Sequence, residues 1–416
     1  MIRGPKRYRS IYTSRRRRTG GAFKWVVGLV LLAALFFVGY SILPVLDSLV
    51  KNGGRPPVSS SSGSKSSSKP GGSSSRAPSS SSQASSAPAV AASIRGIVLP
   101  KSCLSDTAGL NNFISQAKAA GVNLAVIDLK AENGVVNYAS KLTELQGTGI
   151  IAPGAPDASV AAKALTAAGI TPAARIAAFQ DPLAPSAMRG TGVMYAGDHS
   201  INWLDPTNTR WLNPYNAAAR TYIEDLAAEA VSLGYKDIFV DGVTFPTSGS
   251  PDKSGYFGDN LASKEQCLDS FTQELKTRVN AAGGKLAVVT TGAAAAGQAA
   301  ANLGQTQDIF SYSGDFLSPN FCPAFLPQTG LLVGSTTLAA PAGDPVAAVT
   351  ALAGYLKAQD SAKLGMALPF IQAYSDSSHV YTAADVKAEI AALRSAGIGG
   401  YVLYSPTGTY DYSALK

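Results

Sequence analysis

A regular pattern of hydrophobic and polar positions begins near residue 94 and continues to the C-terminus. Short runs of β-branched and other apolar residues alternate with longer Ala-rich stretches of helical period, which is typical of parallel strands joined by crossover helices. Strands are predicted at residues 95–99, 124–129, 173–178, 237–241, 285–290, 308–312, 365–370 and 399–403. An apolar run at 331–335 predicts an additional, inserted strand.

The stretches between these strands predict helices, several of which end in a glycine just before the next strand. The expected helices cover residues 110–120, 159–168, 217–233, 264–281, 293–302, 345–358 and 383–396. Their endings read AAGV, AAGI, LGY and SAGI, and glycine takes the left-handed conformation of a helix end without a Cβ clash. Repetition of this unit favours an α/β fold of the (β/α)8 TIM-barrel type over a doubly wound sheet.

A nucleotide-binding α/β fold has little support. The sequence after the first predicted strand is VLPKSCLSD, which is unlike the glycine-rich phosphate-binding turn G-x-G-x-x-G. The three cysteines are Cys103, Cys267 and Cys322, an odd number that allows at most one internal disulfide. None has the spacing of a zinc ligand, so neither a metal nor a cofactor is predicted.

The N-terminal part of the chain contains a predicted membrane anchor at residues 25–43. This run of nineteen residues carries no charge, and at about 1.5 Å per residue a helix of this length crosses a hydrocarbon core of roughly 30 Å. It is longer than the apolar region of a cleaved signal peptide, and no A-x-A site follows it. We expect an uncleaved transmembrane signal anchor rather than a buried core helix, because no adjacent segment could cover such a helix.

Residues 1–24 form a basic tail that predicts the orientation of the anchor. The tail contains nine Lys or Arg residues and no Asp or Glu, and it accounts for most of the net charge of +8. The positive-inside rule places it in the cytoplasm and the rest of the chain outside the membrane. A basic segment can also bind nucleic acid, but beside a membrane span it favours anionic lipid. We expect a single-pass cell-membrane protein with an extracytoplasmic barrel and no nucleic-acid partner.

Residues 44–93 separate the anchor from the barrel domain, which is predicted at 94–416. The segment is dominated by Ser, with Gly, Pro and Ala, and it lacks the apolar surface needed to offset the entropy lost on ordering. It predicts a disordered linker with a typical span of some 35 Å.

Charged side chains gather at the predicted strand ends, where barrel enzymes place their active sites. The second strand continues as VIDLKAENGVVNY and contributes Asp128, Lys130 and Glu132, of which Asp128 and Lys130 should point to the same side. The third strand contributes Arg175, and the fourth, KDIFVDGVTFP, ends at Asp241. Asp241 is the first candidate for a catalytic carboxylate.

Aromatic and amide side chains at the other strand ends predict a carbohydrate site. They are Trp203, Trp211 and Tyr215 in the loop after the third strand, Gln372 and Tyr374 after the seventh, and Tyr404 at the eighth. Sugars offer a C–H face for aromatic stacking and hydroxyl groups for polar contacts. The structural alternative is that the tryptophans only pin a long loop and that Asp128 and Lys130 form an ion pair.

Several of these segments together resemble a bacterial family of uncharacterised, glycoside-hydrolase-like barrels, over most of residues 94–410. The matching pieces are RGI, VIDLKAENGVVNY, ARIAAFQDP, WLNPYN, KDIFVDGVTFP and GGYVLY. The resemblance implies distantly α-amylase-like chemistry on a glycan. The fourth strand of that family reads like F-D-Y-V-R-F-P, so Asp241 matches its carboxylate, whereas Gly242 and Thr244 replace its tyrosine and arginine.

The second carboxyl group is harder to assign. The family commonly has an acid near the end of strand five, but here that strand reads LAVVTTGAAAAG. Glycoside hydrolysis needs two carboxyl groups, about 5–5.5 Å apart for retention and about 6.5–9.5 Å apart for inversion. With Asp241 as nucleophile or base, the predicted acid is Asp315 after the sixth strand, with Glu132 or Asp128 as alternatives.

Two functions are favoured over a third, an envelope assembly factor whose barrel contacts another protein through an exposed apolar patch outside the mouth. One is a membrane-anchored glycoside hydrolase acting on a polysaccharide or cell-envelope glycan. The other is a catalytically inactive barrel that binds glycan or serves as an envelope scaffold, which the missing acid on strand five favours.

Overall fold

The computed structural model describes residues 91–246, 249–257, 261–298 and 303–416. The predicted basic tail, anchor and most of the predicted linker lie outside these residues. Within the described ranges, no helix combines the length and the apolar character needed to cross a membrane.

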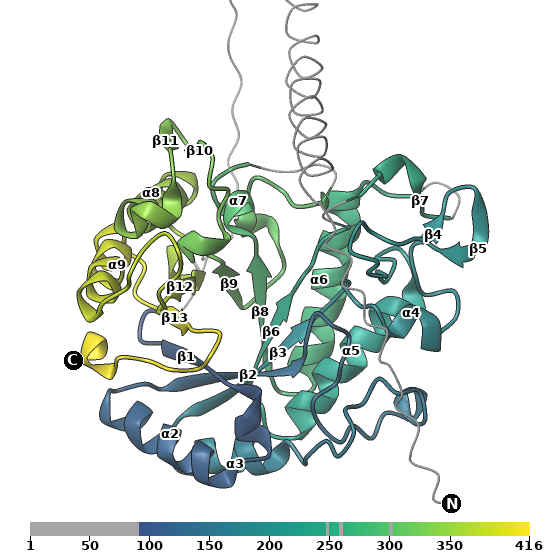
Figure 1. Cartoon of the computed structure of the whole chain (residues 1–416), viewed down its shortest axis with the longest axis horizontal. Coiled ribbons are helices and arrows are strands. Elements are labelled where there is room, and N and C mark those ends of the chain that lie inside the picture. Colours follow the sequence, from purple (N-terminus) through teal and green to yellow (C-terminus); the bar gives the residue numbers. More distant parts are fainter. Residues whose placement is uncertain (1–90, 247–248, 258–260, 299–302) are drawn as a thin grey trace, which may run out of the picture. The chain divides into compact units, whose positions relative to one another are not determined.

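Eight parallel strands form the centre of the domain (Figure 1). In sheet order they are β12 (Phe370–Gln372), β13 (Tyr401–Tyr404), β1 (Arg95–Leu99), β2 (Leu124–Lys130), β3 (Thr171–Ala177), β6 (Asp237–Asp241), β8 (Lys285–Thr290) and β9 (Phe316–Pro319). Isolated parallel bridges join Leu317 to Ala367 and Asn320 to Phe370, connecting the β9 edge to the β12 edge. The sheet therefore closes almost completely, which confirms the predicted parallel barrel of the (β/α)8 type.

Helices follow the strands and cover the outside of the barrel. They are α2 (Thr107–Ala119), α3 (Ser159–Ala167), α4 (Ala184–Ala187), α5 (Ala217–Ser232), α6 (Lys264–Ala281), α7 (Gly292–Ala295), α8 (Pro345–Gln359) and α9 (Ala383–Ala396). Short 3-10 turns are η1 (Lys101–Leu104), η2 (Thr143–Leu145), η3 (Pro251–Lys253), η5 (Ile309–Ser311), η6 (Pro323–Phe325), η7 (Pro341–Gly343), η8 (Leu364–Met366) and η9 (Tyr412–Leu415).

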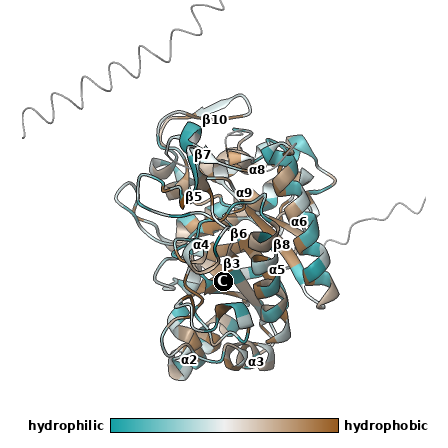
Figure 2. Ribbon diagram, turned by 90° about the vertical axis from the view of Figure 1, so that its right-hand side faces the viewer, coloured by the Kyte–Doolittle hydropathy of each residue, from teal (hydrophilic) through white to brown (hydrophobic). Residues whose placement is uncertain are grey.

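The helix α6 shows how the sequence pattern produces this arrangement. A capping box between Ser263 and Gln266 starts the helix, and Leu268, Phe271 and Leu275 recur at helical spacing on its buried face. Burying each such side chain stabilises the fold by about 1.5–3 kcal/mol. Figure 2 shows the hydrophobic colour on the central strands and hydrophilic turns on the outer side of α6.

The glycines predicted at the helix ends take the expected conformation. Gly397, which follows α9, has φ 98°, and Gly234, which follows α5, has φ 106°. Their backbone therefore turns from each helix into the next strand, as predicted.

The predicted sixth strand, at residues 308–312, was wrong. The Asp308 side chain accepts a hydrogen bond from Phe310 N–H and starts the turn η5, so the chain becomes extended only at β9. The predicted seventh strand also begins too early, because η8 precedes β12. Of the predicted helix at 293–302, the described part contains only the four-residue α7.

Two small sheets are inserted between the barrel elements. β4 (Met194–Tyr195), β5 (Asp198–Asn202) and β7 (Ser254–Gly255) form an antiparallel sheet from the loops that follow β3 and β6. β10 (Leu331–Val333) pairs with β11 (Thr336–Leu338), which confirms the inserted strand.

Candidate active site

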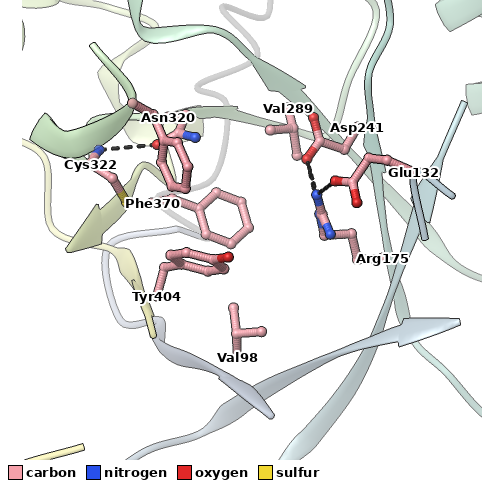
Figure 3. Close-up of a pocket in the computed structure, with 10 residues that line it drawn as sticks. Val98, Glu132, Arg175, Asp241, Val289, Asn320, Cys322, Phe370 and Tyr404 are labelled. Atoms are coloured by element: carbon pink, nitrogen blue, oxygen red, sulfur yellow. Dashed lines mark hydrogen bonds and ion pairs between the residues drawn. The ribbon is translucent and has the colours of Figure 1, made fainter. Parts of the chain in front are cut away.

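Arg175 is the centre of a charged cluster at the barrel mouth. Its Nε and Nη2 atoms donate to Asp241 Oδ2, at 2.9 and 2.7 Å. Its Nη1 donates to Asp128 Oδ1 at 3.0 Å. Its Nη2 also donates to Glu132 Oε1, and Figure 3 shows the contacts of Arg175 to Asp241 and Glu132. One guanidinium group thus binds three carboxyl groups, which come from β2, from the loop after β2 and from the end of β6.

Neighbouring strands bring these groups together. Arg175 lies opposite Asp128 in the β2–β3 register, and Ala177 lies opposite Asp241 in the β3–β6 register. Side chains two residues apart in a strand point to the same face, so Arg175 reaches along β3 toward Asp241. Gly242 N–H donates to Asp241 Oδ1 at 2.6 Å and holds this carboxyl group in one orientation.

The charges of the cluster depend on burial and on mutual attraction. Burial raises the pKa of Asp128, and the nearby Arg175 opposes this shift without cancelling it. Burial lowers the pKa of Arg175, but Asp241, Asp128 and Glu132 raise it more strongly, so that it lies well above its usual value. Arg175 is therefore a permanent cation.

A cavity of about 300 Å³ lies beside this cluster. Glu132, Arg175 and Asp241 line one side, and the other lining residues are Val98, Val289, Asn320, Cys322, Phe325, Phe370 and Tyr404. Figure 3 shows the charged group across the cavity from the rings of Phe370 and Tyr404. The volume is at the lower end of the range of about 300–1,000 Å³ for small-molecule sites. An apolar, aromatic wall opposite a polar one suits a sugar ring.

Two of the carboxyl groups are close enough for glycoside chemistry. Asp241 and Glu132 both accept from Arg175 Nη2, so the two accepting oxygens are separated by at most two hydrogen-bond lengths, about 6 Å. This upper limit lies below the about 6.5–9.5 Å of inverting enzymes and is compatible with the about 5–5.5 Å of retaining ones.

The sequence profile of the family described as "Putative glycosyl hydrolase domain" matches residues 96–410. The chain belongs to this family.

No curated protein matches this chain. Among solved structures it is similar to the glycoside hydrolase domain of PgaB (BpsB) from Bordetella bronchiseptica, with 13% identity over 76% of this chain and 94% of that one and a TM-score of 0.54. It also matches the catalytic domain of a β-amylase from Paenibacillus polymyxa, with 11% identity over 78% and 95% of the two chains and a TM-score of 0.49.

The likeness to the PgaB domain shows a shared barrel fold. For this member of the family, the arginine expected at position 244 by resemblance is the buried Thr244. Asp241 takes its arginine partner from β3 instead, through Arg175. The end of β8 carries Thr290 and Thr291 and no carboxyl group, as the sequence indicated.

Of the predicted site residues, the structure brings together Asp128, Glu132, Arg175, Asp241 and Tyr404. Tyr374 lies beside them, because its ring is 5.9 Å from that of Tyr404 in an edge-on arrangement. The other predicted site residues lie elsewhere.

Lys130 is not part of the mouth. It is fully buried, forms an ion pair with Asp181 at 3.0 Å and donates to Ala177 O at 2.7 Å. The predicted common direction of Asp128 and Lys130 was wrong, because the β2–β3 register shifts between these two residues. The alternative Asp128–Lys130 ion pair is also absent, since Asp128 pairs with Arg175 and Lys130 with Asp181.

The predicted stacking platform of tryptophans was also wrong. Trp203 and Trp211 are only 4% and 2% exposed, and Trp211 Nε1 donates to Asp205 at 3.1 Å. Tyr215 donates to Ala262 O at 2.8 Å and packs against Phe245. These three side chains therefore hold the loop in place and do not form a sugar-binding surface, in agreement with the structural alternative.

Gln372 is buried and forms hydrogen bonds with loops next to the site. Its Oε1 atom accepts from Ala324 N–H at 3.0 Å, and its Nε2 atom donates to Tyr374 O at 3.0 Å and to Asp376 at 3.2 Å. Its side chain is thus committed to neighbouring loops and does not line the cavity.

Asp315 lies at the opposite end of the barrel from Asp241. It directly precedes β9, accepts from Leu286 N–H at the start of β8, and pairs with Lys276 at 3.2 Å. The prediction of Asp315 as the catalytic acid followed from the misplaced sixth strand and is not supported by this geometry.

Four residues of the cavity wall were not predicted from the sequence: Asn320, Cys322, Phe325 and Phe370. The misplaced sixth strand explains the omission of Asn320 and Cys322, because the extended run FLSPNF identifies the strand that these two residues follow. Phe325 lies in η6 and Phe370 begins β12. Cys322 is fully buried and its pKa is raised well above the usual value by that burial, so its thiol is neutral. All three cysteines are free.

Proposed function

We propose that this protein is a glycoside hydrolase that acts on a polysaccharide or cell-envelope glycan. The observation that carries the proposal is the cluster of three carboxyl groups on Arg175, which faces an aromatic wall across one cavity at the C-terminal ends of the strands. Membership of the glycosyl-hydrolase-like family supports the same reaction class.

Asp241 is the proposed nucleophile or base. It receives three N–H donors, two from Arg175 and one from Gly242, and a deprotonated carboxylate is an acceptor only. Attack by this carboxylate on the anomeric carbon would form a glycosyl–enzyme ester, which water then hydrolyses.

Glu132 is the proposed proton donor to the leaving oxygen. Its carboxyl group lines the cavity and its side chain is 46% exposed, so a glycosidic oxygen can reach it. The Asp128 side chain is less exposed than that of Glu132, is not among the residues that line the cavity, and accepts from Arg175 Nη1. It is therefore proposed to hold Arg175 in place.

A catalytically inactive glycan-binding barrel is the second candidate. Two observations favour it: β8 ends without an acid, and each of the three carboxyl groups is engaged by the same arginine. The aromatic wall would serve binding in either case.

The deciding experiment is hydrolysis of a panel of bacterial and plant glycans by the full-length chain. Asp241→Asn is assayed beside it, with Glu274→Gln as a matched control, because Glu274 also pairs with an arginine, Arg220, but lies on α6 outside the cavity. Turnover that disappears only in Asp241→Asn supports the hydrolase. Glycan binding without turnover in all three proteins would establish the binding barrel, and neither binding nor turnover would reject both.

We also propose that the protein is anchored in the cell membrane, with a cytoplasmic N-terminus and an extracytoplasmic barrel. The uncharged run at 25–43 and the basic residues before it support this topology. Protease added to intact cells should digest the barrel, and deletion of residues 25–43 should release the chain from the membrane fraction. Protection of the barrel in intact cells would contradict the proposed topology.

A further inference from the structure

We infer that the cavity selects a positively charged sugar, namely an amino sugar with a free ammonium group within a glycan chain. This inference rests on the proposed function, because it names the substrate class of the same site.

The ionisable groups of the site are unbalanced in favour of negative charge. Glu132 and Asp241 line the cavity, and Asp128 binds the same Arg175 beside it, so three acids face a single cation. Apart from Arg175, none of the described residues that line the cavity is a lysine, arginine or histidine. Hydrolysis requires two carboxyl groups, one of them protonated. The third carboxyl group is not needed for that chemistry, and the site keeps a net negative charge even when the proton donor carries its proton.

Arg175 has little capacity to offset this charge for a substrate. A guanidinium group has five N–H bonds, and the contacts to Asp241, Asp128 and Glu132 use four of them. A sugar carrying a carboxylate or sulfate group would therefore find no free cation and would be repelled by the acids.

The same acids have unused acceptor atoms. Within the part of the chain that the structure describes, hydrogen bonds to Asp128 and Glu132 reach one carboxyl oxygen of each residue. An ammonium group supplies three donors, and charge-assisted hydrogen bonds are roughly twice as strong as neutral ones. The site can therefore bind an ammonium group directly.

The aromatic wall of the cavity indicates what the uncharged part of the ligand is. Phe370 and Tyr404 present apolar rings across the cavity from the acids (Figure 3), and Phe325 extends this wall, its ring 5.7 Å from that of Tyr404. A small cation such as a metal ion would leave this wall without a partner. A pyranose ring carrying an ammonium group matches both sides, with its C–H face on the rings and its charge toward the acids.

The inference is tested by binding of three matched oligosaccharides to the full-length chain, measured by calorimetry. They are oligomers of glucosamine, the same oligomers fully N-acetylated, and oligogalacturonate, assayed at a pH below the pKa of the sugar ammonium group. We expect the glucosamine oligomer to bind at least about tenfold more tightly than the acetylated one, a difference of about 1.4 kcal/mol. Oligogalacturonate should bind weakest, and added salt should reduce the preference.

Variants identify the source of the preference. Asp128→Asn keeps an oxygen acceptor for Arg175 and removes one charge, so the preference should fall several-fold, whereas Glu274→Gln should leave it unchanged. Asp241→Asn provides a second test if Asp128→Asn does not fold, as judged by thermal unfolding, because it removes the charge of an acid that lines the cavity.

The outcomes separate this inference from the proposed function. Equal or tighter binding of the neutral or acidic oligomer, or a preference that Asp128→Asn and Asp241→Asn both leave intact, overturns the amino-sugar assignment while a glycan site remains. Failure to bind or hydrolyse any glycan rejects the glycan-active function itself, and the assignment with it.

Discussion

Arg175 places two of its nitrogen atoms, Nε and Nη2, on the same oxygen of Asp241, at 2.9 and 2.7 Å. The contact links the neighbouring strands β3 and β6. Because Arg175 also binds Asp128 and Glu132, the position of each acid depends on this one side chain.

Replacing Arg175 by lysine should therefore reduce activity while preserving the charge. A lysine ammonium is a point charge and cannot reproduce the planar contacts to three carboxyl groups, and small displacements of a catalytic group cost about 10²-fold in rate. We expect a fall in kcat of that order, with glycan binding largely retained. Steady-state kinetics of Arg175→Lys check this, and wild-type kcat would contradict the assigned role of Arg175.

Glu132→Gln should show the behaviour of a lost proton donor. General acids contribute about 10²–10⁴-fold to such reactions, so hydrolysis of natural glycans should fall by this factor. Aryl glycosides with good leaving groups need less protonation and should be affected much less. An equal loss on both kinds of substrate would assign Glu132 a different role, and the same leaving-group dependence in Asp128→Asn instead would identify Asp128 as the donor.

Removal of Lys130 should destabilise the barrel without any direct effect on the cavity. Lys130 and Asp181 are both 0% exposed, and a buried charge that loses its partner costs about 3–5 kcal/mol. Lys130→Met should show this loss in urea unfolding, and the double variant with Asp181→Asn should recover a large part of it. A double variant as unstable as Lys130→Met would show that the missing charge partner is not the cause.

Glu389 should make the fold less stable as the pH rises. Burial raises the pKa of this carboxyl group from 4.5 to about 8, although a hydrogen bond from Tyr381 opposes the shift. The folded state therefore binds the proton more tightly than the unfolded state. The resulting stabilisation is complete below pH 4.5 and is lost as the pH rises to about 8.

The test compares the free energy of unfolding at several pH values within this window. Removing the titrating group in Glu389→Gln should reduce the decline by up to about 1.4 kcal/mol per pH unit. Glu274→Gln, whose side chain is 47% exposed in the wild type, should leave the decline unchanged. Identical pH profiles for wild type and Glu389→Gln would contradict the prediction.

The wrong predictions from the sequence have local causes. Their effects on the positions of side chains in the folded domain are large. The sixth strand was predicted at 308–312, but Asp308 starts a turn there and the strand β9 covers Phe316–Pro319. Because of this error, Asp315 was predicted at the mouth although it lies at the opposite end of the barrel, and the cavity wall around Asn320 was not predicted. Similarly, one register irregularity in β2 sends Lys130 away from Asp128.

The alternation of apolar runs and helical stretches was enough to predict a parallel (β/α) barrel, its closing glycines and the position of Asp241 and Arg175 at strand ends. These features depend on period and turn chemistry, which are properties of short segments. Only the tertiary structure decided that Arg175 gathers Asp128, Glu132 and Asp241, that Trp203 and Trp211 are buried, and that an aromatic wall faces the acids. Those contacts join residues far apart in the chain, and strand register and loop packing place them.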